Sequence, residues 1–172
     1  MNTTHLHLLL NHFPIIGTLI GSTLLLWGIL RREQQLKSAG AFILVAMAAI
    51  SFPVYLTGEP AEETVEDLPG VSEKMISLHE HAATLATWLL AVTGLLSVTA
   101  IAASIKKSTR TGLLFTIACI ASVLSFAAMA RTGYYGGQIR HTELNGTSAS
   151  PAGEKSKDAG EGSTQKEKDD DD

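Results

Sequence analysis

The stretch AATLATWLLAVTGLLSVTAIAASI, residues 82–105, is 24 residues long and has no charged side chain. In a helix with a rise of about 1.5 Å per residue, about 20 apolar residues cross the roughly 30 Å hydrocarbon core of a bilayer. Lipid offers no hydrogen bonds to the backbone, so a run of this length within a membrane must be helical. The stretch therefore predicts a membrane-spanning helix.

Three further uncharged runs share this character: residues 13–30, 38–58 and 111–130. The first and second runs, and the third and fourth, are joined by short connections, which favours antiparallel neighbours. Residues 1–144 are therefore predicted to form an all-α integral membrane domain, an up-down-up-down four-helix bundle. Residues 145–172 carry eight acidic and four basic side chains against three alanines. We expect them to form a disordered polar tail.

Two local features bear on how the helices pack. Gly17 and Gly21 form a GxxxG pair, a spacing typical of close helix approach in membranes. Pro53 falls in the last turns of the second predicted helix, which is expected to kink or end early there.

Composition disfavours several classes of protein. Of the 172 residues, 45% are hydrophobic, 17% are charged and one is cysteine, Cys119. A single cysteine allows neither an internal disulfide nor a cysteine-based zinc site. The sequence shows no Gly-rich phosphate loop, no basic surface for nucleic acid and no nucleophile–base pair suited to hydrolysis. A soluble enzyme is therefore disfavoured, and nucleic acid is not an expected partner.

The basic residues in the connections predict the orientation in the membrane. Six of them flank the first and third connections: Arg31, Arg32, Lys37, Lys106, Lys107 and Arg110. The middle connection, residues 59–81, has Lys74 alone against seven acidic residues. Because basic residues are enriched on the cytoplasmic side, we expect a multi-pass protein of the inner membrane. Both termini and the acidic connection are predicted to face the periplasmic, outer side.

All six histidines then fall on the outer side: His5, His7, His12, His79, His81 and His141. The first and third helices are diagonal partners in the expected bundle, so a histidine from each could ligate one haem iron or metal ion. His12 and His79 form the preferred pair because they lie closest to the membrane. His7 and His141 are predicted to lie beside this pair or to form a second one. Arg131 either belongs to a structural ion pair or, like Arg140, holds a haem propionate.

Helix geometry separates the two histidines of the third helix, because residues two apart point in nearly opposite directions. His79 shares its face with Ala83, Ala86 and Leu90, which leaves room for a flat cofactor. His81 shares its face with Leu85 and Trp88 and is expected to face lipid. An alternative interpretation needs no ligand, since histidine, tyrosine and tryptophan are all comfortable at a membrane interface.

These observations predict a haem b-binding redox subunit that exchanges electrons with a periplasmic partner or a quinone. One alternative is a membrane protein that binds a single Cu, Zn or Fe ion. The other is a non-catalytic structural subunit of a larger membrane complex.

Four segments, in the same order along the chain, resemble motifs of one large family of bacterial four-helix membrane proteins. Residues 7–15, HLLLNHFPI, resemble the family's HPxxxHFPI opening, and residues 57–63, TGEPAEE, resemble its segment after the second helix. Residues 79–83, HEHAA, are similar to its HEExA start of the third helix. Residues 132–143 resemble its closing GGxIRHxE. The resemblance covers most of residues 5–144.

This resemblance implies a four-helix membrane fold, and the family is described as a domain of unknown function. The positions it singles out are His7, His12, His79, Gly136, Gly137, Arg140, His141 and Glu143. His5 and His81 have no counterpart. Leu8 stands where the family has proline, and Asn11 where an aliphatic residue is common, which alters the start of the first helix.

Overall fold

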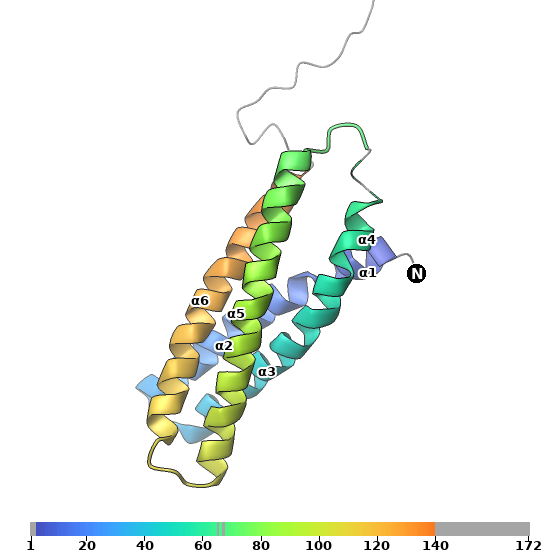
Figure 1. Ribbon diagram of the computed structural model, residues 1–172. Helices are drawn as coiled ribbons and strands as arrows, with labels where there is room; N and C mark the ends of the chain where they lie inside the picture. Colours follow the sequence, from blue (N-terminus) through green and yellow to red (C-terminus); the bar gives the residue numbers. More distant parts are fainter. Residues whose placement is uncertain (1–2, 65, 67, 140–172) are drawn as a thin grey trace, which may run out of the picture.

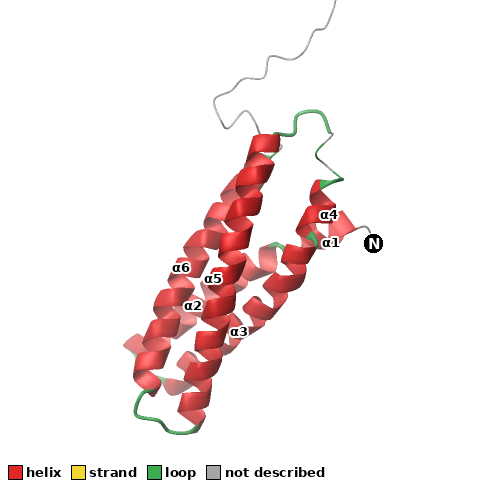
Figure 2. Cartoon of the chain, viewed as in Figure 1, coloured by secondary structure: helices red, strands yellow, loops and turns green. Residues whose placement is uncertain are grey.

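The computed structural model describes residues 3–64, 66 and 68–139. These residues form helices and their connections only (Figure 2). The helices in chain order are α1 (Thr3–Leu10), α2 (His12–Leu30), α3 (Gln34–Leu56), α4 (Gly58–Glu62), α5 (Glu73–Ile105) and α6 (Thr111–Gln138). Four segments are long and apolar enough to cross a membrane: Thr4–Leu30, Gln34–Leu56, Glu73–Ile105 and Thr111–Gln138.

The four long helices form an antiparallel bundle, which confirms the predicted all-α class (Figure 1). Helix α2 packs against α3 and α6, and α5 packs against the same two helices, so α2 and α5 are diagonal partners. The short helices α1 and α4 pack against each other beside the end of α3. We call this end, with His5, His7, His12, His79 and His81, the histidine end. The opposite end, with Lys37, Lys106 and Lys107, is the lysine end.

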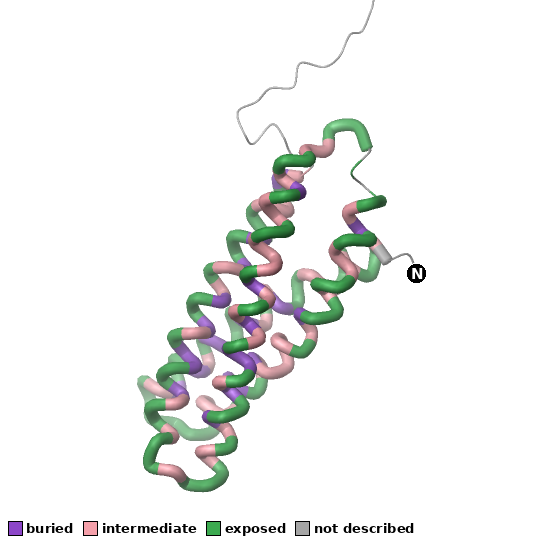
Figure 3. The backbone as a smooth tube through the Cα atoms, in the orientation of Figure 1, coloured by how far each residue is buried: buried purple, intermediate pink, exposed green. Residues whose placement is uncertain are grey.

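Large apolar side chains are exposed on the outside of the bundle, and small or polar ones make up much of its buried inside. Figure 3 shows buried and exposed positions alternating along each long helix. Trp88 is 68% exposed and Leu95 69%, whereas Thr93 and Ser97 on the same helix are fully buried. Exposing such large apolar side chains to water would be unfavourable, whereas lipid accommodates them. The small residues inside let the helices approach each other closely.

Close backbone approach joins α2 to α3 through glycines of both helices. A Cβ atom built on Gly40 would lie 2.6 Å from the backbone nitrogen of Leu25 and 2.7 Å from the carbonyl oxygen of Gly21. A Cβ built on Gly17 would overlap the side chain of Met47. The GxxxG pair thus lies in a tight helix–helix contact within the chain.

Two prolines mark the irregular parts of the helices. Helix α1 ends at Leu10, four residues before Pro14, which has no N–H to donate to the Leu10 carbonyl. Helix α3, which we expected to kink or end early, continues through Pro53 for three residues and ends at Leu56. The Thr57 hydroxyl donates to the carbonyls of Pro53 and Val54 just beyond this end, at 3.0 and 2.9 Å.

Helices α5 and α6 extend beyond the uncharged runs that predicted them, to Glu73 and Gln138. Ile76 of α5 and Thr132 of α6 are buried, which indicates that these extra turns pack on each other. The backbone N–H of Ser72 also donates to the Ile139 carbonyl at 3.1 Å, tying the two ends together. Arg140, His141, Glu143 and the predicted tail lie outside the described residues.

Candidate site at the histidine end

His79 is held between α5 and α6 by its Nδ1 atom. Nδ1 lies 2.9 Å from the Thr132 carbonyl oxygen, which can only accept, so this nitrogen carries the proton. The ring packs on Gly136, where a Cβ would lie 3.1 Å from both Nδ1 and Cε1. When the imidazole is neutral, the hydrogen bond from Nδ1 to the Thr132 carbonyl leaves the lone pair on Nε2, the state in which histidine binds metals.

His7 is anchored in the same manner by the end of α3. Its Nδ1 donates to the Val54 carbonyl at 3.1 Å, with the Thr57 hydroxyl oxygen at 3.2 Å. Gly58 lies beside the ring, since a Cβ there would be 3.7 Å from Cε1. His7 is half-buried. Both imidazoles, one from α1 and one from α5, lie at the histidine end, and each keeps the lone pair on Nε2.

His12 and His81 are exposed, and among the residues that the structure describes each bonds only within its own stretch of chain. His12 Nδ1 lies 3.3 Å from the Leu8 carbonyl, and His81 Nδ1 lies 2.7 Å from the Ser77 carbonyl. His5 is exposed as well. The predicted faces of α5 agree with the structure, because Ala86 and Leu90 are fully buried whereas Trp88 is exposed together with His81.

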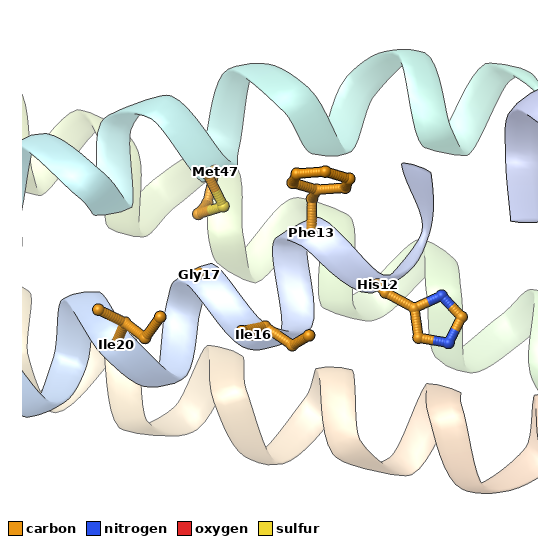
Figure 4. A pocket seen from close by; sticks show the side chains of 6 residues that line it. All are labelled: His12, Phe13, Ile16, Gly17, Ile20 and Met47. Carbon is orange, nitrogen blue, oxygen red and sulfur yellow. The ribbon is translucent and has the colours of Figure 1, made fainter. Parts of the chain in front are cut away.

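His12 borders an apolar hollow of about 260 Å³ on the side of the bundle. The other lining residues are Phe13, Ile16, Gly17 and Ile20 of α2 and Met47 of α3. Figure 4 shows the Phe13 ring directed toward α3 and the His12 ring directed away from Met47. His12, one of the preferred pair, therefore lies at an exposed apolar hollow, whereas His79 is packed against α6.

Arg131 is exposed and pairs with an aromatic residue one turn along α6. Its Nε and Nη2 atoms donate to the Tyr135 hydroxyl at 3.3 and 3.2 Å, and its guanidinium lies 5.4 Å from the Tyr135 ring centroid. The side chain is thereby held at the histidine end, where an anionic group could reach it.

Carboxylates gather beside α4 at the same end. Burial raises the pKa of the Glu62 carboxyl above its ordinary value, and the negative charge of Glu80 on α5 raises it further. Smaller contributions come from Glu66, Glu59 and Glu63.

Replacing Glu62 with glutamine should raise the melting temperature at pH 7 and change it less at pH 4. A carboxyl whose pKa is raised by folding contributes stability below its ordinary pKa and loses that contribution as the pH rises through the raised value. Thermal unfolding of detergent-solubilised protein at both pH values measures the effect. Glu33→Gln, exposed at the opposite end, is the control. Equal shifts at the two pH values would contradict the expectation.

Gly136 and Gly137 offer a matched test of how His79 is seated. A Cβ on Gly136 would press on the His79 ring, whereas a Cβ on Gly137 would meet no atom of the described residues within 4 Å. Gly136→Val should therefore displace the ring and move its imidazole NMR resonances, while Gly137→Val should leave them in place. Similar resonance shifts in both variants would show that the ring does not depend on this contact.

Sequence reasoning did not find the groups that anchor the two rings. These are the backbone carbonyls of Val54 and Thr132, and a carbonyl leaves no signature in a sequence. Thr57 lies in one of the segments on which the family resemblance rests, but its role beside His7 depends on where the chain turns after α3.

Together, the apolar surface and the four long helices define a multi-pass α-helical membrane protein. No family model, curated protein or solved structure matches the chain.

Proposed function

We propose that this membrane protein binds haem b at its histidine end and transfers single electrons. The observation that carries the proposal is the pair His7 and His79, both half-buried, both donating from Nδ1 to a backbone carbonyl, and both with Nε2 available. A histidine that ligates iron commonly has its other nitrogen fixed in this way.

The donor set suits haem better than a bare ion. A porphyrin supplies four nitrogens to the iron, so the protein needs to add only two imidazoles, and bis-histidine ligation is suited to electron transfer. Gly58 and Gly136 lie beside the two rings. Arg131 is placed to attract a propionate, and Arg140 and His141 are predicted to join it.

His7 is favoured over His12 as the partner of His79. It is half-buried whereas His12 is exposed, and α3 fixes its ring. His12 instead borders the apolar hollow between α2 and α3. We propose that this hollow is where a quinone ring meets the protein, since a quinone needs an apolar surface and a hydrogen-bonding group beside it. A periplasmic electron-transfer protein is the other proposed partner.

A second candidate is a site for a single Cu, Zn or Fe ion, although the described residues include no group of three or more His, Cys, Asp or Glu side chains that could hold a metal ion. Glu80 follows His79 directly, and Glu62 lies within electrostatic range of Glu80. An imidazole with nearby carboxylates suits a transition-metal ion better than it suits haem.

An absorption spectrum and elemental analysis of gently purified protein distinguish these functions. Sharp reduced bands with one iron per chain would support haem b. Copper, zinc or iron without those bands would support the ion site. Protein free of both would contradict the two proposals and favour a structural subunit.

We further propose that the histidine end faces the periplasm and the lysine end the cytoplasm of a bacterial inner membrane. The support is the charge distribution, with six basic residues around the two connections of the lysine end. Reporter fusions after Lys37 and Arg110 should report a cytoplasmic location, and fusions within residues 63–69 or after Asn145 an external one. A cytoplasmic result from residues 63–69 would reverse the orientation.

A further inference from the structure

Six buried hydroxyls lie in the middle of the bundle, away from the histidine end. We call them the hydroxyl cluster, and they belong to three helices: Thr18 and Ser22 of α2, Thr93 and Ser97 of α5, and Ser122 and Ser125 of α6. Five of them are fully buried and Ser22 is 6% exposed.

The hydroxyls of α2 and α5 lie at matching depths. Ser22 and Ser97 each lie eight residues before the last residue of their helices, Leu30 and Ile105, and Thr18 and Thr93 each lie twelve residues before it. With about 1.5 Å per residue, these positions are about 12 and 18 Å from the lysine end, near the middle of a bilayer. Because α2 and α5 are diagonal partners, the hydroxyls of the two helices lie across the bundle core from each other.

Three members of the cluster have partners within the protein. The Thr93 and Ser125 hydroxyls lie 2.9 Å apart, and Ser125 also donates to the Ala121 carbonyl at 3.0 Å. Ser122 donates to the Cys119 carbonyl at 2.8 Å. These bonds satisfy the hydroxyls of α6 and one hydroxyl of α5.

The other three hydroxyl oxygens, of Thr18, Ser22 and Ser97, have no hydrogen-bond partner among the described residues. A hydroxyl removed from water without a replacement bond costs free energy, and lipid cannot supply that bond. A small polar molecule inside the bundle would supply these three oxygens with hydrogen-bond partners.

Apolar groups close the cluster on both sides. Leu25, Ala100 and Phe115 lie between it and the lysine end, and Ala86, Leu90 and Met129 lie between it and the histidine end. The site is therefore an enclosed polar layer in the membrane.

We propose that the hydroxyl cluster binds water, held between α2 and α5 by Thr18, Ser22 and Ser97. Water and a hydroxyl group can each donate and accept, and a buried water typically makes about three hydrogen bonds. A cation suits the site poorly, because all six side chains are neutral and a lone charge at this depth would be costly. The proposal is independent of the haem proposal.

Transfer of NMR magnetisation from water to threonine methyl groups tests this proposal on the full chain in detergent. The Thr18 methyl should show a cross-peak to long-lived water. Thr23 is the matched control, because it lies on the exposed face of the same helix and its hydroxyl donates to the Leu19 carbonyl at 2.8 Å. We expect no such cross-peak for Thr23. Absence of the Thr18 cross-peak would overturn the proposal and indicate that the hydroxyls bond to their own helices.

Ser97→Ala provides the second arm. Removing this hydroxyl from α5 should weaken the cross-peak at Thr18 on α2 at least fivefold, whereas Thr23→Val should leave it unchanged. An unchanged cross-peak in Ser97→Ala would contradict a shared water. Replacing choline chloride with sodium chloride in the buffer should not move the Thr18 methyl resonance. A shift of this resonance that saturates with sodium concentration would overturn the proposal in favour of a cation site.

Discussion

His79→Ala is expected to lower the haem content of the purified protein at least about tenfold, because it removes a proposed iron ligand whose orientation α6 fixes. Haem bound per chain, measured from the absorption spectrum after purification at equal yield, gives the result. His81→Ala is the matched control, since it removes an exposed imidazole two residues further along the same helix. Equal haem content in the two variants would contradict a ligand role for His79.

The same measurement on His7→Ala and His12→Ala identifies the second ligand. We expect His7→Ala to resemble His79→Ala and His12→Ala to retain haem, because His7 is half-buried with its ring fixed by α3, whereas His12 borders the exposed hollow. The reverse result would restore the pair that the sequence favours, His12 and His79.

Gly40→Leu is expected to destabilise the bundle by about 1–3 kcal/mol or to prevent its assembly. The new side chain would meet the backbone of Leu25 and Gly21, which cannot move aside without separating α2 from α3. Thermal unfolding in detergent measures the loss. Gly112→Leu is the control, because a Cβ on Gly112 meets no atom within 4 Å. A melting temperature for Gly40→Leu equal to that of the control would show that the helices do not approach so closely.

The membrane helices could be predicted from the sequence because one physical property, the absence of charge over about 20 residues, determines them. The orientation of His79 and His81 could be predicted too, since helix geometry alone sets the angle between them. The helix ends at Glu73 and Gln138 could not be predicted. The turns there contain charged residues and are stabilised by packing between α5 and α6, and such packing does not appear as an apolar run in the sequence.

The candidate site was harder to predict than the fold. The sequence favours His12 over His7 because His12 is closer to the uncharged run. In the structure the break before Pro14 makes α1 a separate helix, and His7 then reaches the carbonyl of Val54. The hydroxyl cluster was also not predicted from the sequence, because Ser and Thr in a membrane helix usually indicate only close packing. Which hydroxyls have partners depends on the arrangement of three helices.

We propose that two histidine nitrogens bind one haem iron at the histidine end. Electron paramagnetic resonance of the oxidised protein, purified with and without ¹⁵N-labelled histidine, tests this ligation. We expect a low-spin ferric signal whose nitrogen couplings change with the label as two imidazole ligands require, and which disappears in His79→Ala. A high-spin signal, couplings to a single imidazole, or no ferric haem signal would contradict it.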